Sequence, residues 1–230
     1  NASKKCQTFD INTNCTGLVT AMTLAAERMK ADSNIRYAVV IGVEVLSRFT
    51  NIEDQDTSIF FSDGASGVLL GQVSEGYGLV KSSFLTDSST YESVRLRGGG
   101  SSFPGATELY EPSIRYIEQN GLATWKQAVT NLPIVIDDVL KASSLHIDNI
   151  DFFVFHQANS NLIHYVLKKL KVPVHKNYNN VEEIGNTGAA SIGIAMSEAN
   201  EKGLIRPDSY LLMAAVGAGF NFAANIWRME

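Results

Sequence analysis

Residues 150–170 read IDFFVFHQANSNLIHYVLKKL and join two elements of different type. The first part, Ile150–Phe155, is an aromatic and β-branched run that predicts a buried strand. The second part, Asn159–Leu170, repeats its apolar residues at helical spacing, so a helix follows the strand after a short turn. Strand–turn–helix units of this kind build α/β folds.

The same alternation extends in both directions, which indicates an α/β fold with mainly parallel sheets. The expected strands are Cys6–Ile11, Arg36–Val45, Ala65–Gln72, Gly78–Phe84, Tyr210–Val216 and Phe220–Trp227. The expected helices are Thr16–Ala31, Pro112–Ser143 and Gly188–Lys202. We expect Arg36–Val45 to be buried, Pro133 to kink or break its helix, and residues 75–78 to close a hairpin. The segment Thr86–Gly105, rich in serine and glycine, predicts a loop.

A faint internal repeat indicates two copies of one α/β unit. A helix, a strand and a small-residue strand follow one another near the N-terminus and again near the C-terminus. We therefore assign residues 1–86 to the remainder of a first half, 87–111 to a connecting loop and 112–230 to a second half. Because the sequence starts at Asn1 and enters a strand-like stretch at once, we expect the first half to be incomplete.

Composition excludes several classes of protein. Of the 230 residues 45% are hydrophobic, and 24 acidic against 19 basic side chains give a net charge of −5. No basic field would therefore attract nucleic acid or an anionic membrane. The longest uncharged apolar run, Tyr210–Phe220, is about half of the ~20 residues that span a bilayer. Two cysteines and the lack of a secretory leader pattern favour a cytoplasmic protein.

Cys15 lies where a strand gives way to an apolar helix, in the segment DINTNCTGLVTAM. Unpaired backbone N–H groups and the helix dipole at such a position favour an anion, which lowers the pKa of a thiol. Cys15 is therefore a candidate nucleophile. The alternative is a small buried residue at a strand–helix junction.

Three further positions lie at the ends of expected elements. His156 stands at the carboxyl end of a strand, where α/β sheets collect ligand sites, or is a half-buried histidine satisfied by backbone. Asn186 precedes a small-residue helix and is a site residue or a helix cap. The Gly217–Gly219 turn presents backbone N–H groups to a ligand or is only a tight turn. No two histidines have the spacing of metal ligands on a helix face, so we expect no metal site.

Together these motifs resemble the thiolase-fold condensing enzymes, most closely the β-ketoacyl-[acyl-carrier-protein] synthase III family. The matching segments are Cys15 at a helix start, HQAN at 156–159, GNTGAAS at 185–191, GAGF at 217–220 and FFSDGASG at 60–67. The resemblance runs from Phe9 to Arg228. It implies a layered α-β-α-β-α fold of two pseudo-repeated α/β halves, the first of them incomplete in this chain.

The resemblance also implies roles for individual residues. Cys15 would accept an acyl group, and His156 and Asn186 would complete a Cys-His-Asn triad. The backbone N–H groups of Cys15 and Ala218 would form an oxyanion hole. The residues expected to contact substrate are Asn159 and Phe220.

The reaction implied by the family is a decarboxylative Claisen condensation. An acyl-CoA primer and malonyl-acyl carrier protein would give a 3-oxoacyl thioester, in fatty acid or related lipid and polyketide biosynthesis. No cofactor is implied apart from these thioester substrates, and the family pattern is a homodimer.

Three positions depart from the pattern of the family. Gln55 stands where a basic residue usually helps to bind coenzyme A, and Asn161 stands where an arginine often faces acyl carrier protein. Asn14 replaces the alanine that commonly precedes the nucleophile. The carrier and the primer therefore stay open.

One alternative is a non-decarboxylating relative: a head-to-head acyl condensing enzyme, a hydroxymethylglutaryl-CoA-synthase-like enzyme or an acyltransferase to oxygen or nitrogen. Another is a non-catalytic partner subunit.

Overall fold

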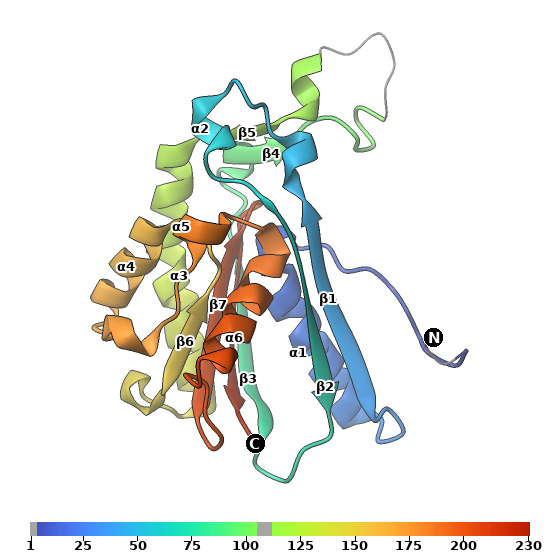
Figure 1. Ribbon diagram of the computed structural model, residues 1–230, viewed down its shortest axis with the longest axis vertical. Coiled ribbons are helices and arrows are strands. Elements are labelled where there is room, and N and C mark those ends of the chain that lie inside the picture. The colour runs from blue at the N-terminus through green and yellow to red at the C-terminus, as the bar shows by residue number, and fades with distance from the viewer. Residues whose placement is uncertain (1–3, 105–111) are drawn as a thin grey trace.

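A computed structural model describes residues 4–104 and 112–230, in which a four-stranded sheet forms the centre (Figure 1). Its strand order is β3-β8-β7-β6, and the strands are Gly78–Thr86, Asn221–Arg228, Tyr210–Gly217 and Phe152–Phe155. Two smaller pairs stand apart from it: β1 (Tyr37–Val45) with β2 (Asp63–Gly71), and β4 (Val94–Leu96) with β5 (Ile117–Gln119).

Four longer helices accompany the strands: α1 (Gly17–Ala31), α3 (Gly121–Ser143), α4 (Ser160–Lys169) and α6 (Ser191–Glu201). The short helices are α2 (Gln55–Ser58), α5 (Val181–Ile184) and the 3-10 turns η1 (Asn14–Thr16), η2 (Leu46–Phe49), η3 (Tyr91–Ser93), η4 (Pro112–Arg115), η5 (Ile147–Asn149), η6 (Val174–Lys176) and η7 (Gly188–Ala190). None of the helices among the described residues combines the length and the apolar character needed to cross a bilayer.

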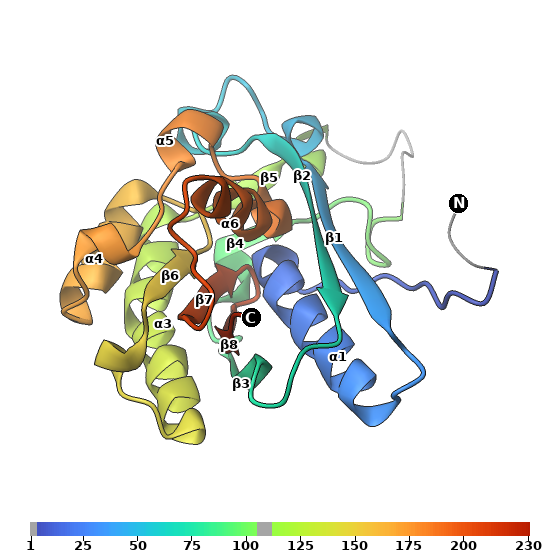
Figure 2. The same ribbon diagram turned by 60° about the horizontal axis from the view of Figure 1, so that its bottom comes forward.

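Helices cover both faces of the four-stranded sheet because its strands are apolar on both faces. In β6, Phe153 and Phe155 belong to a core shared with α3 and α4, whereas Phe152 and Val154 belong to a core shared with α1 and α6. The β1–β2 ribbon lies on the outer side of α1 and α6 (Figure 2). The layers are thus helices, sheet, helices and ribbon.

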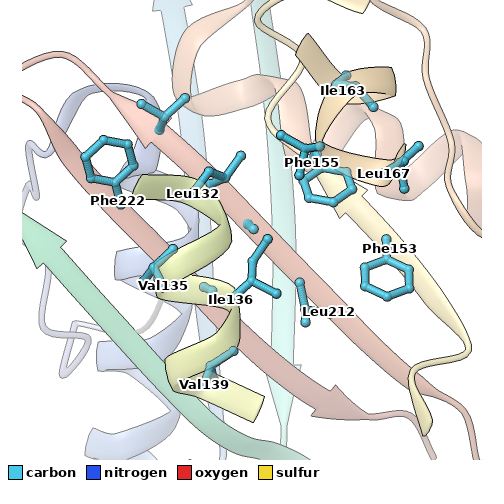
Figure 3. Close-up of a cluster of buried hydrophobic side chains, with 14 of the residues drawn as sticks. Leu132, Val135, Ile136, Val139, Phe153, Phe155, Ile163, Leu167, Leu212 and Phe222 are labelled. Carbon is cyan, nitrogen blue, oxygen red and sulfur yellow. The ribbon is translucent and has the colours of Figure 1, made fainter. Parts of the chain in front are cut away.

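The larger core fills the space between α3, α4 and the sheet (Figure 3). On α3 the residues Leu132, Ile136 and Val139 recur at helical spacing and are almost fully buried. They meet Leu212 of β7 and Phe222 of β8. Burial of each such side chain contributes about 1.5–3 kcal/mol, so this core holds α3 firmly against the sheet.

Pro133 lies inside α3 and does not end it, so the predicted break is wrong. A proline lacks the N–H that would bond to the carbonyl four residues earlier, here that of Val129. The ammonium group of Lys169 on α4 donates to this carbonyl oxygen at 2.9 Å. The neighbouring helix therefore satisfies the carbonyl group that the proline leaves unpaired.

The prediction of mainly parallel sheets is wrong for the described residues. Only β6 and β7 pair in parallel, whereas β7–β8, β3–β8 and β1–β2 are antiparallel. The hairpin at residues 75–78 is also wrong, because β2 pairs with β1 and β3 pairs with β8. Strand pairing depends on distant partners that a local apolar run does not specify.

Four local predictions also need correction. Strand β1 is not buried throughout but alternates, with the side chains of Val39 and Ile41 exposed and Val40 buried. Residues 6–11 form no strand, since they lie beside no partner strand within the described residues. The expected helix 112–143 begins only at Gly121, after η4 and β5, where the Asn120 side chain accepts a bond from the Ala123 N–H. The expected loop 86–105 contains η3 and β4.

Candidate active site

A cavity of about 400 Å³ opens at the carboxyl ends of the parallel strands β6 and β7. All six residues that the sequence assigned to the site line it: Cys15, His156, Asn159, Asn186, Ala218 and Phe220. They come from segments that are far apart in the chain. The fold therefore gathers in one place what the sequence presents as separate motifs.

Cys15 lies in the 3-10 turn η1, directly before α1. Thr16 closes this turn, with both its N–H and its hydroxyl donating to the Thr13 carbonyl oxygen. The end of β7 packs against the turn at Gly217, where an added Cβ would lie 2.9 Å from the Thr13 oxygen and 3.1 Å from the Cys15 nitrogen. A glycine is therefore required beside the candidate nucleophile.

The thiol of Cys15 has a high pKa, and not the low one expected from a helix start. Burial, together with a smaller effect of the negative charge of Glu44, raises the pKa of Cys15 to about 12. The expectation failed because desolvation of the thiolate outweighs the favourable effect of the backbone N–H groups. At neutral pH Cys15 is a protonated thiol.

His156 follows β6 and is almost completely buried. Its backbone N–H donates to the Ala214 carbonyl oxygen of β7 at 2.9 Å, and its Nδ1 lies 2.7 Å from the hydroxyl oxygen of Ser191. Burial lowers the pKa of His156 to about 4, so the imidazole is neutral at pH 7. A neutral imidazole presents one N–H donor and one acceptor.

Asn186 is held on both its backbone and its side chain. Its N–H donates to the Phe60 carbonyl oxygen at 2.8 Å, and its own carbonyl oxygen accepts from the Ser62 N–H at 3.0 Å. Its Oδ1 accepts from the Gly188 N–H at 2.9 Å. This bond assigns the amide orientation and leaves the Nδ2 donor for the cavity.

The carboxylate of Glu44 lies against the loop that follows Asn186, beside Gly188 and Ala189. Gly188 has a φ of +53°, and an added Cβ would lie 2.8 Å from the carboxyl carbon of Glu44. The same carboxylate accepts the Ala189 N–H at 3.1 Å. Glu44 on β1 thus anchors the loop that carries Asn186.

The remaining predicted site residues, Ala218, Phe220 and Asn159, also line the cavity. The Ala218 carbonyl oxygen accepts from Asn14 Nδ2 at 3.0 Å, which ties the residue before the nucleophile to the Gly217–Gly219 turn. Phe220 is buried. Asn159 caps α4, its side chain accepting the Leu162 N–H at 3.2 Å.

Sequence reasoning missed three contributors to the site. Ser191 contacts His156, Glu44 contacts the Asn186 loop, and Trp125 of α3 lines the cavity. Ser191 ends the GNTGAAS motif, so a signal for it was present in the sequence. The signals for Glu44 and Trp125 are absent locally, since both reach the site only through tertiary packing.

Comparison with known proteins supplies the family. The family described as 3-oxoacyl-[acyl-carrier-protein] synthase III matches residues 9–88, and the C-terminal part of that family matches residues 140–229. The chain belongs to this family. The resemblance noted from the motifs is thereby confirmed.

Relatives of this synthase III chain agree with that assignment. The β-ketoacyl-[acyl-carrier-protein] synthase III of Fusobacterium nucleatum is 32% identical over 97% of this chain and 68% of the relative. That of Caldanaerobacter subterraneus is 34% identical over 95% of this chain and 66% of the relative. The chain thus spans about two thirds of the length of these curated relatives.

Solved structures place the chain in the same fold. The 3-oxoacyl-[acyl-carrier-protein] synthase III of Aquifex aeolicus superposes with a TM-score of 0.86 at 28% identity, covering 98% of this chain and 68% of that one. The enzyme of Thermus thermophilus gives a TM-score of 0.87 at 27% identity, with 96% and 68% covered. The fold is therefore the α/β thiolase fold of the synthase III family.

Proposed function

We propose that the protein to which this chain belongs condenses an acyl thioester with a malonyl thioester, releasing CO2 and forming a 3-oxoacyl thioester. The observation that carries the proposal is the meeting of Cys15, the His156 imidazole and the Asn186 amide in one cavity. The names of the related synthases support this reading. A thiol beside two neutral donors suits transfer and elongation of an acyl group.

The first half-reaction transfers the acyl group to Cys15. The Cys15 sulfur attacks the thioester carbonyl, the carbon–sulfur bond to the donor breaks, and the departing thiolate takes the proton of the Cys15 thiol. The backbone N–H groups of Cys15 and Ala218 are proposed to stabilise the oxyanion. One such donor contributes about 2.7–4 kcal/mol in comparable sites.

The second half-reaction uses His156 and Asn186. The carbon–carbon bond to the malonyl carboxylate breaks, CO2 leaves, and the electron pair passes to an enolate oxygen. Two neutral donors, the imidazole N–H and the Asn186 Nδ2–H, would hold that oxygen. The enolate carbon then attacks the acyl-Cys15 carbonyl, and the Cys15 sulfur leaves as a thiolate that takes up a proton from solvent to restore the thiol.

The burial of His156 and Cys15 supports the roles proposed for them in the two half-reactions. Because the pKa of His156 is lowered to about 4, the side chain is poorly suited to take the thiol proton and well suited to donate as a neutral group. An acylated Cys15 carries no charge, so the burial that opposes the free thiolate does not oppose the intermediate.

The substrates, assembly and location follow from the family and form part of the proposal. An acyl-CoA is the proposed primer, malonyl-acyl carrier protein the extender and a homodimer the working assembly. The reaction as proposed needs no cofactor besides these thioesters. We place the protein in the cytoplasm, in fatty acid or related lipid and polyketide biosynthesis.

Release of CO2 from malonyl-acyl carrier protein tests the proposal in the protein of full natural length. The wild type, charged with an acyl-CoA, should release CO2 and form the 3-oxoacyl product. Cys15→Ala should abolish product, and His156→Ala and Asn186→Ala should each lower its rate by about 100-fold or more. Cys6→Ala, which changes an exposed cysteine that is not among the residues lining the cavity, serves as the control. Full product formation by Cys15→Ala would show that the nucleophile is wrongly assigned.

A further inference from the structure

Ser191 is the first residue of α6 and is 2% exposed. Its hydroxyl oxygen lies 2.7 Å from Nδ1 of His156 and 3.3 Å from the backbone nitrogen of Gln157. The Gln157 N–H can only donate, so it uses one lone pair of the Ser191 oxygen. The direction of the bond to His156 then depends on where the hydroxyl proton goes.

The hydroxyl proton of Ser191 has a single acceptor in the described part of the chain. The two contacts above are its hydrogen-bond partners there, and only Nδ1 can accept. The reverse arrangement, with Nδ1–H donating to the oxygen, would leave the hydroxyl proton buried and unpaired, which is costly. The hydroxyl therefore donates to Nδ1.

This bond decides which nitrogen of the neutral imidazole carries the proton. If Nδ1 accepts, the proton resides on Nε2, the ring nitrogen without a partner among the described residues. His156 lines the cavity, so Nε2–H is the donor available to a bound substrate.

We propose that Ser191 is a positioning residue that holds His156 in the Nε2–H tautomer and thereby provides the donor used in decarboxylation. This inference rests on the proposed function for its catalytic meaning, but the tautomer itself does not. The segment 186–191 then contains both Asn186, which is one donor, and Ser191, which orients the other donor, His156.

The surroundings keep both partners in place. The Gln157 side chain donates to the Phe155 carbonyl oxygen at 2.7 Å and accepts the Asn180 N–H at 3.0 Å, which fixes the peptide that reaches Ser191. On α6, an added Cβ at Gly193 would lie 2.3 Å from the hydroxyl of Ser66 on β2. The start of α6 is thus packed closely against the ribbon and has little room to shift.

Nitrogen-15 NMR of the histidine rings in the full-length protein tests the tautomer directly. These 230 residues contain 4 histidines, and His156→Gln identifies the signal of His156. In the wild type, Nδ1 should have the shift of an unprotonated nitrogen and Nε2 that of a protonated one. Ser191→Ala should lose this single tautomer, Ser191→Thr should retain it, and Ser197→Ala, an exposed change on the same helix, should leave it unaltered.

Kinetics then separate positioning from general structural damage. Ser191→Ala should lower the rate of CO2 release by about tenfold, while acylation of Cys15 by acyl-CoA, which does not use His156, should proceed at the wild-type rate. Ser191→Thr, which keeps the hydroxyl group, should retain the wild-type rate of CO2 release. If both half-reactions fell equally, Ser191 would be only structural, and the positioning role would be overturned.

Two results would overturn the inference whatever the variants do. A proton on Nδ1 in the wild type would reverse the bond direction, and an unchanged tautomer in Ser191→Ala would remove Ser191 from its cause. A wild type that shows the expected tautomer but releases no CO2 would contradict the proposed function instead. The two failures are therefore distinguishable.

Discussion

At the scale of single residues, burial sets the protonation of two titratable side chains that line the cavity, Cys15 and His156. It raises the pKa of Cys15 to about 12 and lowers the pKa of His156 to about 4, so both are uncharged at neutral pH. Neither side chain therefore carries a charge of its own when a bound substrate arrives. Fixed neutral donors such as the His156 imidazole and the Asn186 amide can then stabilise an oxyanion on the substrate.

The lowered pKa of His156 has a consequence for stability. Unfolding returns this pKa from about 4 to its ordinary 6.5, so between these values the unfolded chain binds more protons and the free energy of unfolding rises with pH. The contribution is complete above about pH 6.5 and is lost as the pH falls toward 4. Across the window it amounts to about 3 kcal/mol.

Urea unfolding at intervals across that pH window measures the effect. His156→Gln should flatten the pH dependence by about 3 kcal/mol, whereas His164→Gln, at an exposed position of α4, should not change it. A His156→Gln profile as steep as that of the wild type would contradict the burial argument.

At the scale of elements, a hydrogen bond from a neighbouring helix satisfies a backbone group that the local sequence leaves unpaired. Helix α3 passes through Pro133 because Lys169 of α4 donates to the freed carbonyl oxygen of Val129. Both helices border the cavity, through Trp125 and Leu162. The bond therefore joins two walls of the site as well as two helices.

A double-mutant cycle tests whether the Lys169 bond compensates for the backbone hydrogen bond that Pro133 removes. Lys169→Met keeps much of the side-chain length but removes the donor, and we expect it to cost about 1 kcal/mol of unfolding free energy in the wild type. Pro133→Ala restores a backbone N–H for the Val129 carbonyl, so Lys169→Met should cost little in that background. Lys168→Met on the same helix is the control. Equal costs in both backgrounds would show that the Lys169 bond does not compensate for the proline.

At the scale of the whole molecule, the sequence predicted which residues line the cavity better than it predicted the pairing of the strands. Local position alone left Cys15, His156 and Asn186 with structural alternatives, and the resemblance of their motifs to the family singled them out; all three line one cavity. The partners of β2 and β3 were not predicted correctly, since pairing across a sheet depends on residues distant in the chain. The pKa of Cys15 was misjudged for the same reason: burial and the charge of Glu44 come from packing, not from the helix start.

The central claim is that Cys15 carries the acyl group, and intact mass measurement tests it most directly. The full-length protein is incubated with a panel of acyl-CoAs, and any adduct is located by peptide mapping. We expect one acyl mass, on the peptide containing Cys15 and absent from Cys15→Ala, with Cys6 unmodified. An acyl group on any other residue, or no adduct from any donor including acyl carrier protein thioesters, would contradict the account.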